Sequence, residues 1–258
     1  MSDLAQYIDH TLLKPDATRG QIETLCAEAA EHNFATVCVN GSRVELAHSL
    51  LEDCDVQVAT VVGFPLGAMD ADVKRYETEA AVDLGAGEID MVMNVGRFKD
   101  GDHDYILREI RDVVEAADDR IVKVILETCL LSDDEIKKAC QLVMQAQAHF
   151  VKTSTGFGSA GATIEHVKLM RETVSQFAGV KAAGGIRNAT DARAMIEAGA
   201  TRLGPASRRR PCRRRGRREG RRRTLSHRPG HPRGGEGTSG TSGRQPGIGY
   251  QCPGVGIR

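Results

Sequence analysis

Short apolar runs alternate with longer amphipathic segments along the first 204 residues. There are eight such runs: Tyr7–Leu13, Thr36–Asn40, Gln57–Phe64, Glu88–Asn94, Ile121–Glu127, His149–Thr155, Gly179–Gly185 and Thr201–Gly204. The segments between them have a helical period. One begins with the capping box formed by Ser132 and Glu135, and it carries Ile136, Ala139 and Val143 on one face. Strands that alternate with helices in this way predict a parallel sheet.

The number and spacing of the runs favour an α/β fold of the (β/α)₈ type, a TIM barrel. Barrels of this type divide about 250 residues among eight units. The length of one such unit is close to the spacing between successive apolar runs in this chain. An open doubly wound sheet remains an alternative. Such sheets often have a G-x-G-x-x-G turn after the first strand, and none follows the first run.

Residue parity in four neighbouring runs places charged groups inside this barrel. Successive side chains of a strand point alternately to the interior and to the surrounding helices. In Glu88–Asn94 the apolar residues Ile89, Met91 and Met93 occupy the helix-facing side, which leaves Asp90 inside. The same alternation turns four further charged residues inward: Lys123, Glu127, Lys152 and Lys181. A single inward lysine is often only an ion-pair partner, but three lysines and two carboxylates near the active-site end of a barrel favour catalysis.

Two of these lysines suggest the type of chemistry. A lysine amine attacks a carbonyl carbon only when it is unprotonated, and a free lysine has a pKa of about 10.4. A second ammonium group and desolvation both lower that pKa. Lys152 and Lys181 lie on adjacent predicted strands and have this relation. An imine at Lys152 would act as an electron sink for a retro-aldol cleavage, and Asp90 would move the protons, through water.

Seven sequence motifs occur in order along the same region. They are Ile8–Pro15, Val37–Asn40, Val62–Gly67, Glu88–Asn94, Val124–Cys129, Phe150–Phe157 and Val180–Arg187. Together they resemble the class I deoxyribose-phosphate aldolase family, whose members form a Schiff base with the substrate. The resemblance extends to Arg202-Leu-Gly204 and covers nearly all of the first 204 residues.

The resemblance implies a reaction and a set of residue roles. The reaction is reversible cleavage of 2-deoxy-D-ribose 5-phosphate to D-glyceraldehyde 3-phosphate and acetaldehyde, a step in deoxyribose phosphate catabolism, without metal or organic cofactor. Lys152 would form the imine, Lys181 would tune it, and Asp90 would donate and accept protons. Asp9 and Cys38 would lie beside the substrate, although each could equally serve packing or strand-end hydrogen bonding.

A phosphorylated substrate also needs hydrogen-bond donors for its phosphate. Barrels often supply backbone N–H groups from the last loops, and the resemblance implies Gly156, Gly184 and Gly185 for this role. A glycine pair by itself more often marks only a tight turn.

Lys123 and Glu127 would lie behind the catalytic groups and set the charge balance around them.

The charge distribution divides the chain after Gly204. The net charge of the 258 residues is zero, yet residues 1–204 have a net charge of −13 and residues 205–258 a net charge of +13. The second part contains 15 Arg, 12 Gly and 6 Pro and shows no apolar period. It cannot bury enough surface to fold alone, so we expect a barrel domain at 1–204 and a disordered basic tail at 205–258.

The tail begins where the resemblance ends. The family continues from R-x-G into a G-x-S-x-G phosphate loop and a final helix, whereas this chain reads Gly204-Pro-Ala-Ser-Arg. Pro205 removes a backbone donor. The eighth unit is therefore expected to be incomplete or altered. A reading-frame slip in a GC-rich gene would explain the tail, and reading the coding DNA in the other frames tests this hypothesis. The alternative is an Arg/Gly-rich arm that binds nucleic acid.

Other functions remain open at this point. The barrel could be a catalytically impaired relative that has lost its phosphate loop, or another class I aldolase or a transaldolase. A metal-dependent aldolase is disfavoured, because the histidines of the first 204 residues form no cluster with ligand spacing, so no metal site is expected.

Location and partners are inferred from what the sequence contains. Seven cysteines without a C-x-x-C pair suggest neither a disulfide framework nor a zinc site, and there is no export signal or long apolar run. We expect a cytoplasmic enzyme with a small phosphorylated sugar as substrate, and with no membrane or nucleic-acid partner apart from the alternative role of the tail. The resemblance also suggests a homodimer.

Overall fold

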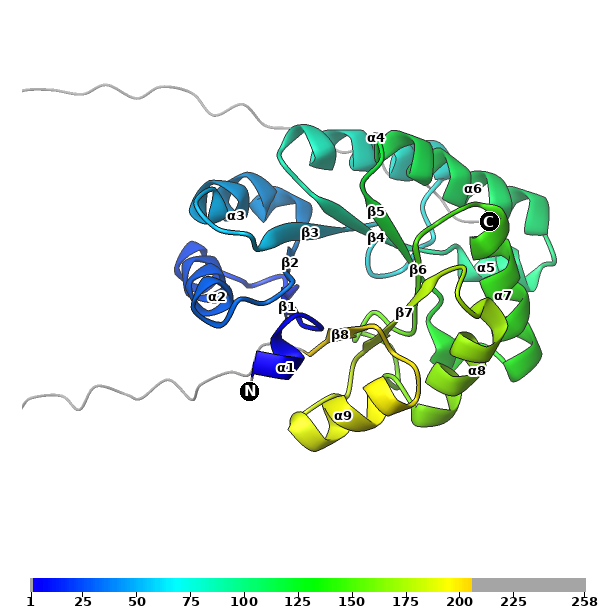
Figure 1. Cartoon of the computed structure of the whole chain (residues 1–258). Helices are drawn as coiled ribbons and strands as arrows, with labels where there is room; N and C mark the ends of the chain where they lie inside the picture. The colour runs from blue at the N-terminus through cyan, green and yellow to red at the C-terminus, as the bar shows by residue number, and fades with distance from the viewer. Residues whose placement is uncertain (1, 206–258) are drawn as a thin grey trace, which may run out of the picture. The chain divides into compact units, whose positions relative to one another are not determined.

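Eight parallel strands hydrogen-bond in chain order in the computed structural model, which describes residues 2–205 (Figure 1). The strands are β1 (Asp9–Leu12), β2 (Thr36–Val39), β3 (Gln57–Val62), β4 (Glu88–Val92), β5 (Ile121–Ile125), β6 (Phe150–Lys152), β7 (Gly179–Ala183) and β8 (Arg202–Gly204). The helices are α1 (Ser2–Ala5), α2 (Arg19–His32), α3 (Val44–Leu51), α4 (Ala71–Asp83), α5 (Val95–Lys99), α6 (His103–Ala116), α7 (Asp133–Gln145), α8 (Ile164–Val174) and α9 (Ala189–Glu197), with 3₁₀ turns η1 (Gly41–Arg43) and η2 (Thr128–Leu130).

The first and last strands close the ring. Ile8, next to β1, pairs in parallel with Leu203 of β8, and the Leu203 N–H donates to the Tyr7 carbonyl oxygen at 2.6 Å. A doubly wound sheet would instead leave two open edges. The predicted TIM barrel is therefore confirmed, and the open-sheet alternative is wrong.

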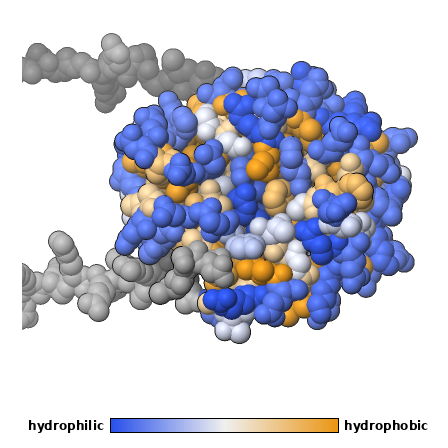
Figure 2. All heavy atoms as spheres, in the orientation of Figure 1, coloured by the Kyte–Doolittle hydropathy of each residue, from blue (hydrophilic) through white to orange (hydrophobic). Residues whose placement is uncertain are grey.

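The outer layer forms because each amphipathic helix buries one face on the strands. In α7 the predicted residues Ile136, Ala139 and Val143 are fully buried. Its capping box is also present, because the Glu135 N–H donates to Ser132 Oγ and the Ser132 N–H donates to Glu135 Oε2. Polar residues therefore face outward, and hydrophilic side chains cover most of the face shown in Figure 2.

The barrel interior has two chemically different sides. Near β1–β3 it contains a small apolar cluster of Leu13, Cys38, Ala59 and Val61, with Phe64 packed against it. The other side carries buried charged side chains instead, which are Asp9 of β1, Glu88 and Asp90 of β4, Lys123 of β5, Lys152 of β6 and Lys181 of β7. Because the apolar cluster excludes water from one side, the charged groups lie in a dry and partly apolar environment.

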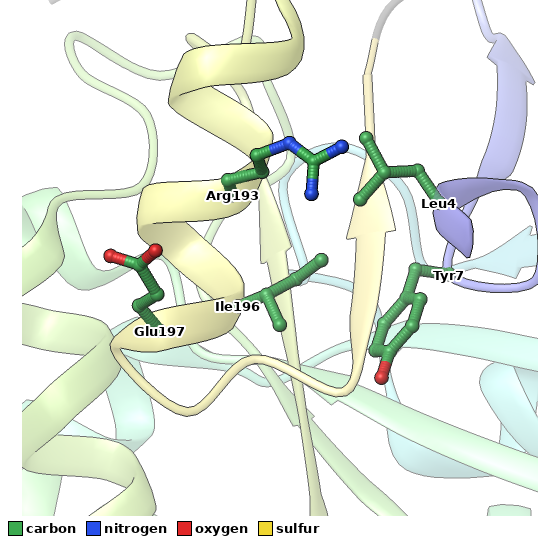
Figure 3. A pocket seen from close by; sticks show the side chains of 5 residues that line it. All are labelled: Leu4, Tyr7, Arg193, Ile196 and Glu197. Atoms are coloured by element: carbon green, nitrogen blue, oxygen red, sulfur yellow. The ribbon is translucent and has the colours of Figure 1, made fainter. Parts of the chain in front are cut away.

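The eighth unit has its strand, β8, and the prediction that this unit is incomplete or altered concerns residues that lie outside the described part, apart from Pro205. Beside β8, Leu4 and Tyr7 from the N-terminal segment and Arg193, Ile196 and Glu197 of α9 line a hollow (Figure 3). The predicted disordered tail, its proposed frameshift origin and its proposed binding to nucleic acid concern residues outside the described part, apart from Pro205. Within the described part, every helix is too short or too polar to cross a membrane.

Candidate active site

Asp90 of β4 lies at the centre of a buried charge cluster inside the barrel. Its Oδ1 accepts a hydrogen bond from Lys123 Nζ at 2.7 Å. Its Oδ2 accepts from both Lys152 Nζ and Lys181 Nζ, each at 2.7 Å. The side chain of Lys152 is 3% exposed and the other three are fully buried. One carboxylate thus contacts all three predicted interior lysines.

Strand register explains why these residues meet. Asp90 and Lys123 are direct cross-strand partners on β4 and β5, and Lys152 and Lys181 are direct partners on β6 and β7. On β5, Lys123 pairs with Phe150 rather than with Lys152. Lys152 therefore lies one inward position nearer to the C-terminal end of the barrel, where active sites of this fold open.

Two further charged residues belong to the cluster, and parity alone did not select them. Glu88 forms an ion pair with Lys123 at 2.5 Å. Arg202 forms ion pairs with Glu88 at 2.9 Å and with Asp9 at 2.6 Å. Asp9 also pairs with Lys181. A sequence signal was available, because Glu88 lies two residues before Asp90 and so shares its face of the strand.

The cluster contains one more basic side chain than it has carboxylates. Asp9, Glu88 and Asp90 are matched by three cations, namely Lys123, Lys181 and Arg202. A protonated Lys152 adds a fourth positive charge to a buried site, and an unbalanced buried charge is costly. The charge balance therefore favours Lys152 as the lysine that gives up its proton.

The pKa shifts have the same pattern. Burial lowers the pKa of Lys152, Asp90 opposes that effect, and the charge of Lys181 adds to it, so the net shift is downward. Burial would also lower the pKa of Lys181, but Asp9 and Asp90 outweigh it and the net shift is upward. Burial would raise the pKa of Asp90, yet the three lysines hold it well below its usual range. The site thus combines a Lys152 whose pKa is lowered with a cationic Lys181 whose pKa is raised and an ionised Asp90.

The predicted glycine loops lie together at the C-terminal end of β6 and β7. Gly156, Gly184 and Gly185 all have positive φ angles, of 84°, 80° and 82°. A Cβ on Gly184 would lie 3.7 Å from the Gly156 Cα and 3.0 Å from the Gly161 Cα, so the two loops touch. A side chain on Gly184 would press against the backbone of the neighbouring loop, so glycine at this position allows the two loops to approach each other.

Comparison with known proteins connects this geometry to a family. The model of the DeoC/LacD family aldolases matches residues 4–221. A protein of Thermoanaerobacter pseudethanolicus named deoxyribose-phosphate aldolase is 57% identical over 208 residues, which are 80% of this chain and 93% of that protein. The chain belongs to the DeoC/LacD aldolase family.

Solved structures agree with this family assignment. A crystal structure described as a putative deoxyribose-phosphate aldolase from Coccidioides immitis matches with a TM-score of 0.78 and 45% identity, over 80% of this chain and 82% of that one. A tetrameric deoxyribose phosphate aldolase from Aeropyrum pernix matches with a TM-score of 0.75 and 33% identity, over 80% and 87% of the two chains. The predicted resemblance is confirmed.

Cys38 lies inside the barrel of this DeoC/LacD family aldolase, close to the charge cluster. Its side chain is fully buried, and burial raises the pKa of the thiol to about 11. Asp90 and Lys152 are near enough to influence that pKa. Cys38 is therefore a neutral group that borders the charged half of the interior.

Glu127 takes a different place from the one that parity suggests. It follows the end of β5 with φ of 55°, and its carboxylate accepts hydrogen bonds from the Thr155 hydroxyl and N–H. Both residues line a hollow at the barrel mouth, together with Pro65, Leu66, Val92, Val95, Leu130, Phe157 and Gly158. Glu127 therefore contacts residues at the barrel mouth, whereas Lys123 contacts Asp90 directly in the barrel interior.

The titratable side chains of the described part of the chain do not form a metal site. Among residues 2–205, no group of three or more His, Cys, Asp or Glu side chains has the arrangement that a metal ion needs.

Proposed function

We propose that this chain catalyses reversible cleavage of 2-deoxy-D-ribose 5-phosphate to D-glyceraldehyde 3-phosphate and acetaldehyde, through an imine on Lys152. The observation that carries the proposal is the sharing of Asp90 Oδ2 by Lys152 and Lys181 in a buried site. Relatives of 55–57% identity that are named deoxyribose-phosphate aldolase support the substrate. The reaction belongs to deoxyribose phosphate catabolism.

The first half of the reaction forms the imine. Neutral Lys152 Nζ attacks the aldehyde carbon C1 of the open-chain sugar phosphate, and loss of water with uptake of one proton from solvent gives a protonated imine. Lys181 keeps its charge and so disfavours protonation of the free Lys152 amine. Lys123 holds the other oxygen of Asp90 and keeps that carboxylate oriented toward the two reactive lysines.

The second half breaks the carbon–carbon bond. The C3 hydroxyl loses its proton, the C2–C3 bond breaks, and its electron pair moves toward the imine nitrogen, which gives an enamine and releases glyceraldehyde 3-phosphate. Protonation of the enamine at C2 and hydrolysis of the imine release acetaldehyde. We assign Asp90 as the group that relays these protons, through water, because it lies beside the imine nitrogen.

The remaining sequence-predicted residues have supporting positions in this scheme. Asp9 anchors Lys181, and Cys38 borders the site, so both would lie close to the substrate. The backbone at Gly156, Gly184 and Gly185 would bind the phosphate group. Lys123 and Glu127 would act from behind and beside the reacting groups.

Assembly and location follow by analogy. The Aeropyrum pernix relative is described as a tetramer, which supports a homo-oligomer, with a homodimer as the smallest form. The five cysteines among the described residues are all free, and this supports a reducing cytoplasm.

Trapping the imine tests the proposed function. Purified chain is incubated with 2-deoxyribose 5-phosphate or with acetaldehyde alone, borohydride is added, and peptide mapping locates any mass increase. We expect an adduct on Lys152 with both compounds. Absence of an adduct from a folded chain contradicts the proposal and favours an impaired barrel.

The same experiment also examines the altered end of the barrel. Pro205 has no N–H to donate at the position after β8. An adduct with acetaldehyde but not with the sugar phosphate would therefore locate the defect in phosphate binding rather than in imine formation.

The rate of imine formation should depend on pH through Lys152. Its pKa lies below the ordinary value of 10.5, because burial and Lys181 disfavour the charged form. The rate should rise with pH as the ammonium loses its proton, and the midpoint should lie below 10.5. Acetaldehyde trapping across a pH series measures this. A midpoint at or above the ordinary value contradicts the assignment of Lys152 as the deprotonated amine.

A further inference from the structure

A second buried ion pair lies outside the strand barrel, between α4 and α6. Lys74 and Glu109 are both fully buried, and Lys74 Nζ donates to Glu109 Oε1 at 2.5 Å. The other two Lys74 donors bind the carbonyl oxygens of Gly67 and Val92, each at 2.8 Å. All three protons of the ammonium group are thus used, and two of them join separate parts of the backbone.

The two carbonyl groups belong to segments at the mouth of the barrel. Val92 ends β4, the strand that carries Asp90, and Gly67 lies in the loop between β3 and α4. Glu109 extends the link, because its Oε2 accepts from the Asn94 N–H at 3.1 Å. Lys74 therefore fastens the β3–α4 loop to the end of the strand that holds Asp90.

The other end of the same loop is held by a residue that lies one turn after Lys74 in α4. Glu77 of α4 accepts a hydrogen bond from the Gly63 N–H at 2.8 Å. The Gly67 N–H then donates to the Gly63 carbonyl oxygen at 2.7 Å, which closes the loop. A Cβ on Gly63 would lie 2.8 Å from Lys74 Cε, and one on Gly67 would lie 2.3 Å from the Met93 carbonyl oxygen. The loop therefore lies directly on its supports, and both glycines are needed for that approach.

Between these two fastened glycines the loop presents apolar side chains to the site. Phe64 packs on the interior cluster that includes Cys38, and its ring meets that of Phe157 edge to face at 5.3 Å between centroids. Leu66 is 80% exposed and, with Pro65, lines the hollow at the barrel mouth. A leucine that is held rigidly yet left open to solvent is suited to contact a ligand rather than to stabilise the core.

We infer that Lys74 is a positioning residue which, together with Glu77, holds Gly63–Gly67 as a fixed wall of the hollow that binds the sugar phosphate. The inference rests on the proposed function, since it takes the hollow beside Thr155 and Val92 as the place of the substrate. If this wall were mobile, binding of the sugar chain would cost more entropy, and the bound sugar would be placed less accurately relative to Lys152. Acetaldehyde has only two carbons and needs only Lys152 itself.

Two variants, which remove the contacts at opposite ends of the loop, test the inference. Lys74→Met combined with Glu109→Gln removes the buried pair without leaving one charge unpaired. Glu77→Ala removes the contact to Gly63 from a half-buried position, so it remains informative if the first variant fails to fold. The control is Arg75→Met, since Arg75 is the exposed neighbour of Lys74 on α4 and its side chain forms a salt bridge with exposed Glu79.

Three measurements separate positioning from general stability. In both loop variants we expect KM for 2-deoxyribose 5-phosphate to rise about tenfold or more, while the rate of acetaldehyde trapping on Lys152 stays within about twofold of the parent chain. Amide hydrogen exchange of the peptide that covers residues 63–70 should become faster in both. Arg75→Met should change none of these quantities.

Other outcomes overturn the inference. Equal losses in acetaldehyde trapping and in sugar cleavage would mean that the pair only stabilises the fold. Faster exchange with an unchanged KM would mean that the loop does not touch the substrate, and unchanged exchange would mean that the two side chains do not fix it. Failure of the parent chain to form any imine instead refutes the proposed function, while the exchange comparison still decides whether Lys74 and Glu77 hold the loop.

Discussion

Replacing Lys152 with methionine is expected to reduce sugar-phosphate cleavage by about 10⁴-fold or more, because no imine can form without this amine. The same substitution should not unfold the chain. It removes the one basic side chain by which the basic groups of the cluster outnumber its carboxylates. Methionine also fills a similar volume in a buried position. Urea unfolding should therefore show a free energy of unfolding equal to that of the parent chain or higher by about 1–2 kcal/mol.

Lys137→Met provides the matched control for this experiment. Lys137 lies on α7 with a side chain that is 47% exposed, and it pairs only weakly with exposed Asp134. Its replacement should leave both cleavage and trapping unchanged. Retained cleavage by Lys152→Met, or a borohydride adduct that moves to Lys181, would assign the imine to another lysine.

The residues of this cluster were largely accessible from sequence because they lie inside regular strands. Alternation along a strand has a fixed period, so one apolar set, such as Ile89, Met91 and Met93, determines the direction of Asp90 between them. The same logic selected Lys123, Lys152 and Lys181, and the structure brings all three to Asp90. The pattern could not give the distances, because the tilt and stagger of the strands decide which layers meet.

Parity failed where the strands stop. The predicted run to Glu127 continues two residues past the end of β5 at Ile125, and Glu127 has a left-handed backbone that turns its side chain toward Thr155. Similarly, Asn94 follows β4 and its side chain caps α5. Glu127 lines the mouth of the site, and for both residues loop geometry rather than strand period decides the direction of the side chain.

Long-range ion pairs were also beyond the sequence pattern. Arg202 joins Asp9 across 193 positions of the chain, and it can do so only because β8 closes onto β1. Lys74 and Glu109 are of residue types that are ordinarily exposed on helices, and only the packing of α4 against α6 buries them. Such groups are identified by tertiary contacts and not by local periodicity.

Asp90→Asn is expected to have the second largest effect, and it should impair both stability and turnover. Asparagine cannot balance the charges of Lys123 and Lys181, so these two buried ammonium groups would lose a shared partner, and Lys152 would lose the same contact. We expect a loss of about 3–5 kcal/mol in the free energy of unfolding at neutral pH. Cleavage should fall by about 10²–10⁴-fold, because the proton relay is lost.

The pH dependence identifies the cause of each part of that loss. Burial would raise the pKa of Asp90, but the lysines lower it far more, so its stabilising contribution is complete above the unfolded value of about 3.9 and is lost as the pH falls through the folded value. The stability difference between the parent chain and Asp90→Asn should therefore be largest near neutral pH and shrink in acid. Asp134→Asn, at a side chain that is 94% exposed, is the control and should show no such difference.

Imine formation in Asp90→Asn should respond in the opposite way from turnover. Asp90 raises the pKa of Lys152 against the effects of burial and Lys181, so its removal lowers that pKa further. The midpoint of acetaldehyde trapping should consequently move to lower pH than in the parent chain, while cleavage of the sugar phosphate is nearly lost. A variant that keeps its stability, its trapping midpoint and its cleavage rate would show that Asp90 neither balances the lysines nor moves protons. A variant that forms the imine at lower pH but fails to turn over would separate these two roles, because charge balance governs the first step and proton transfer the second.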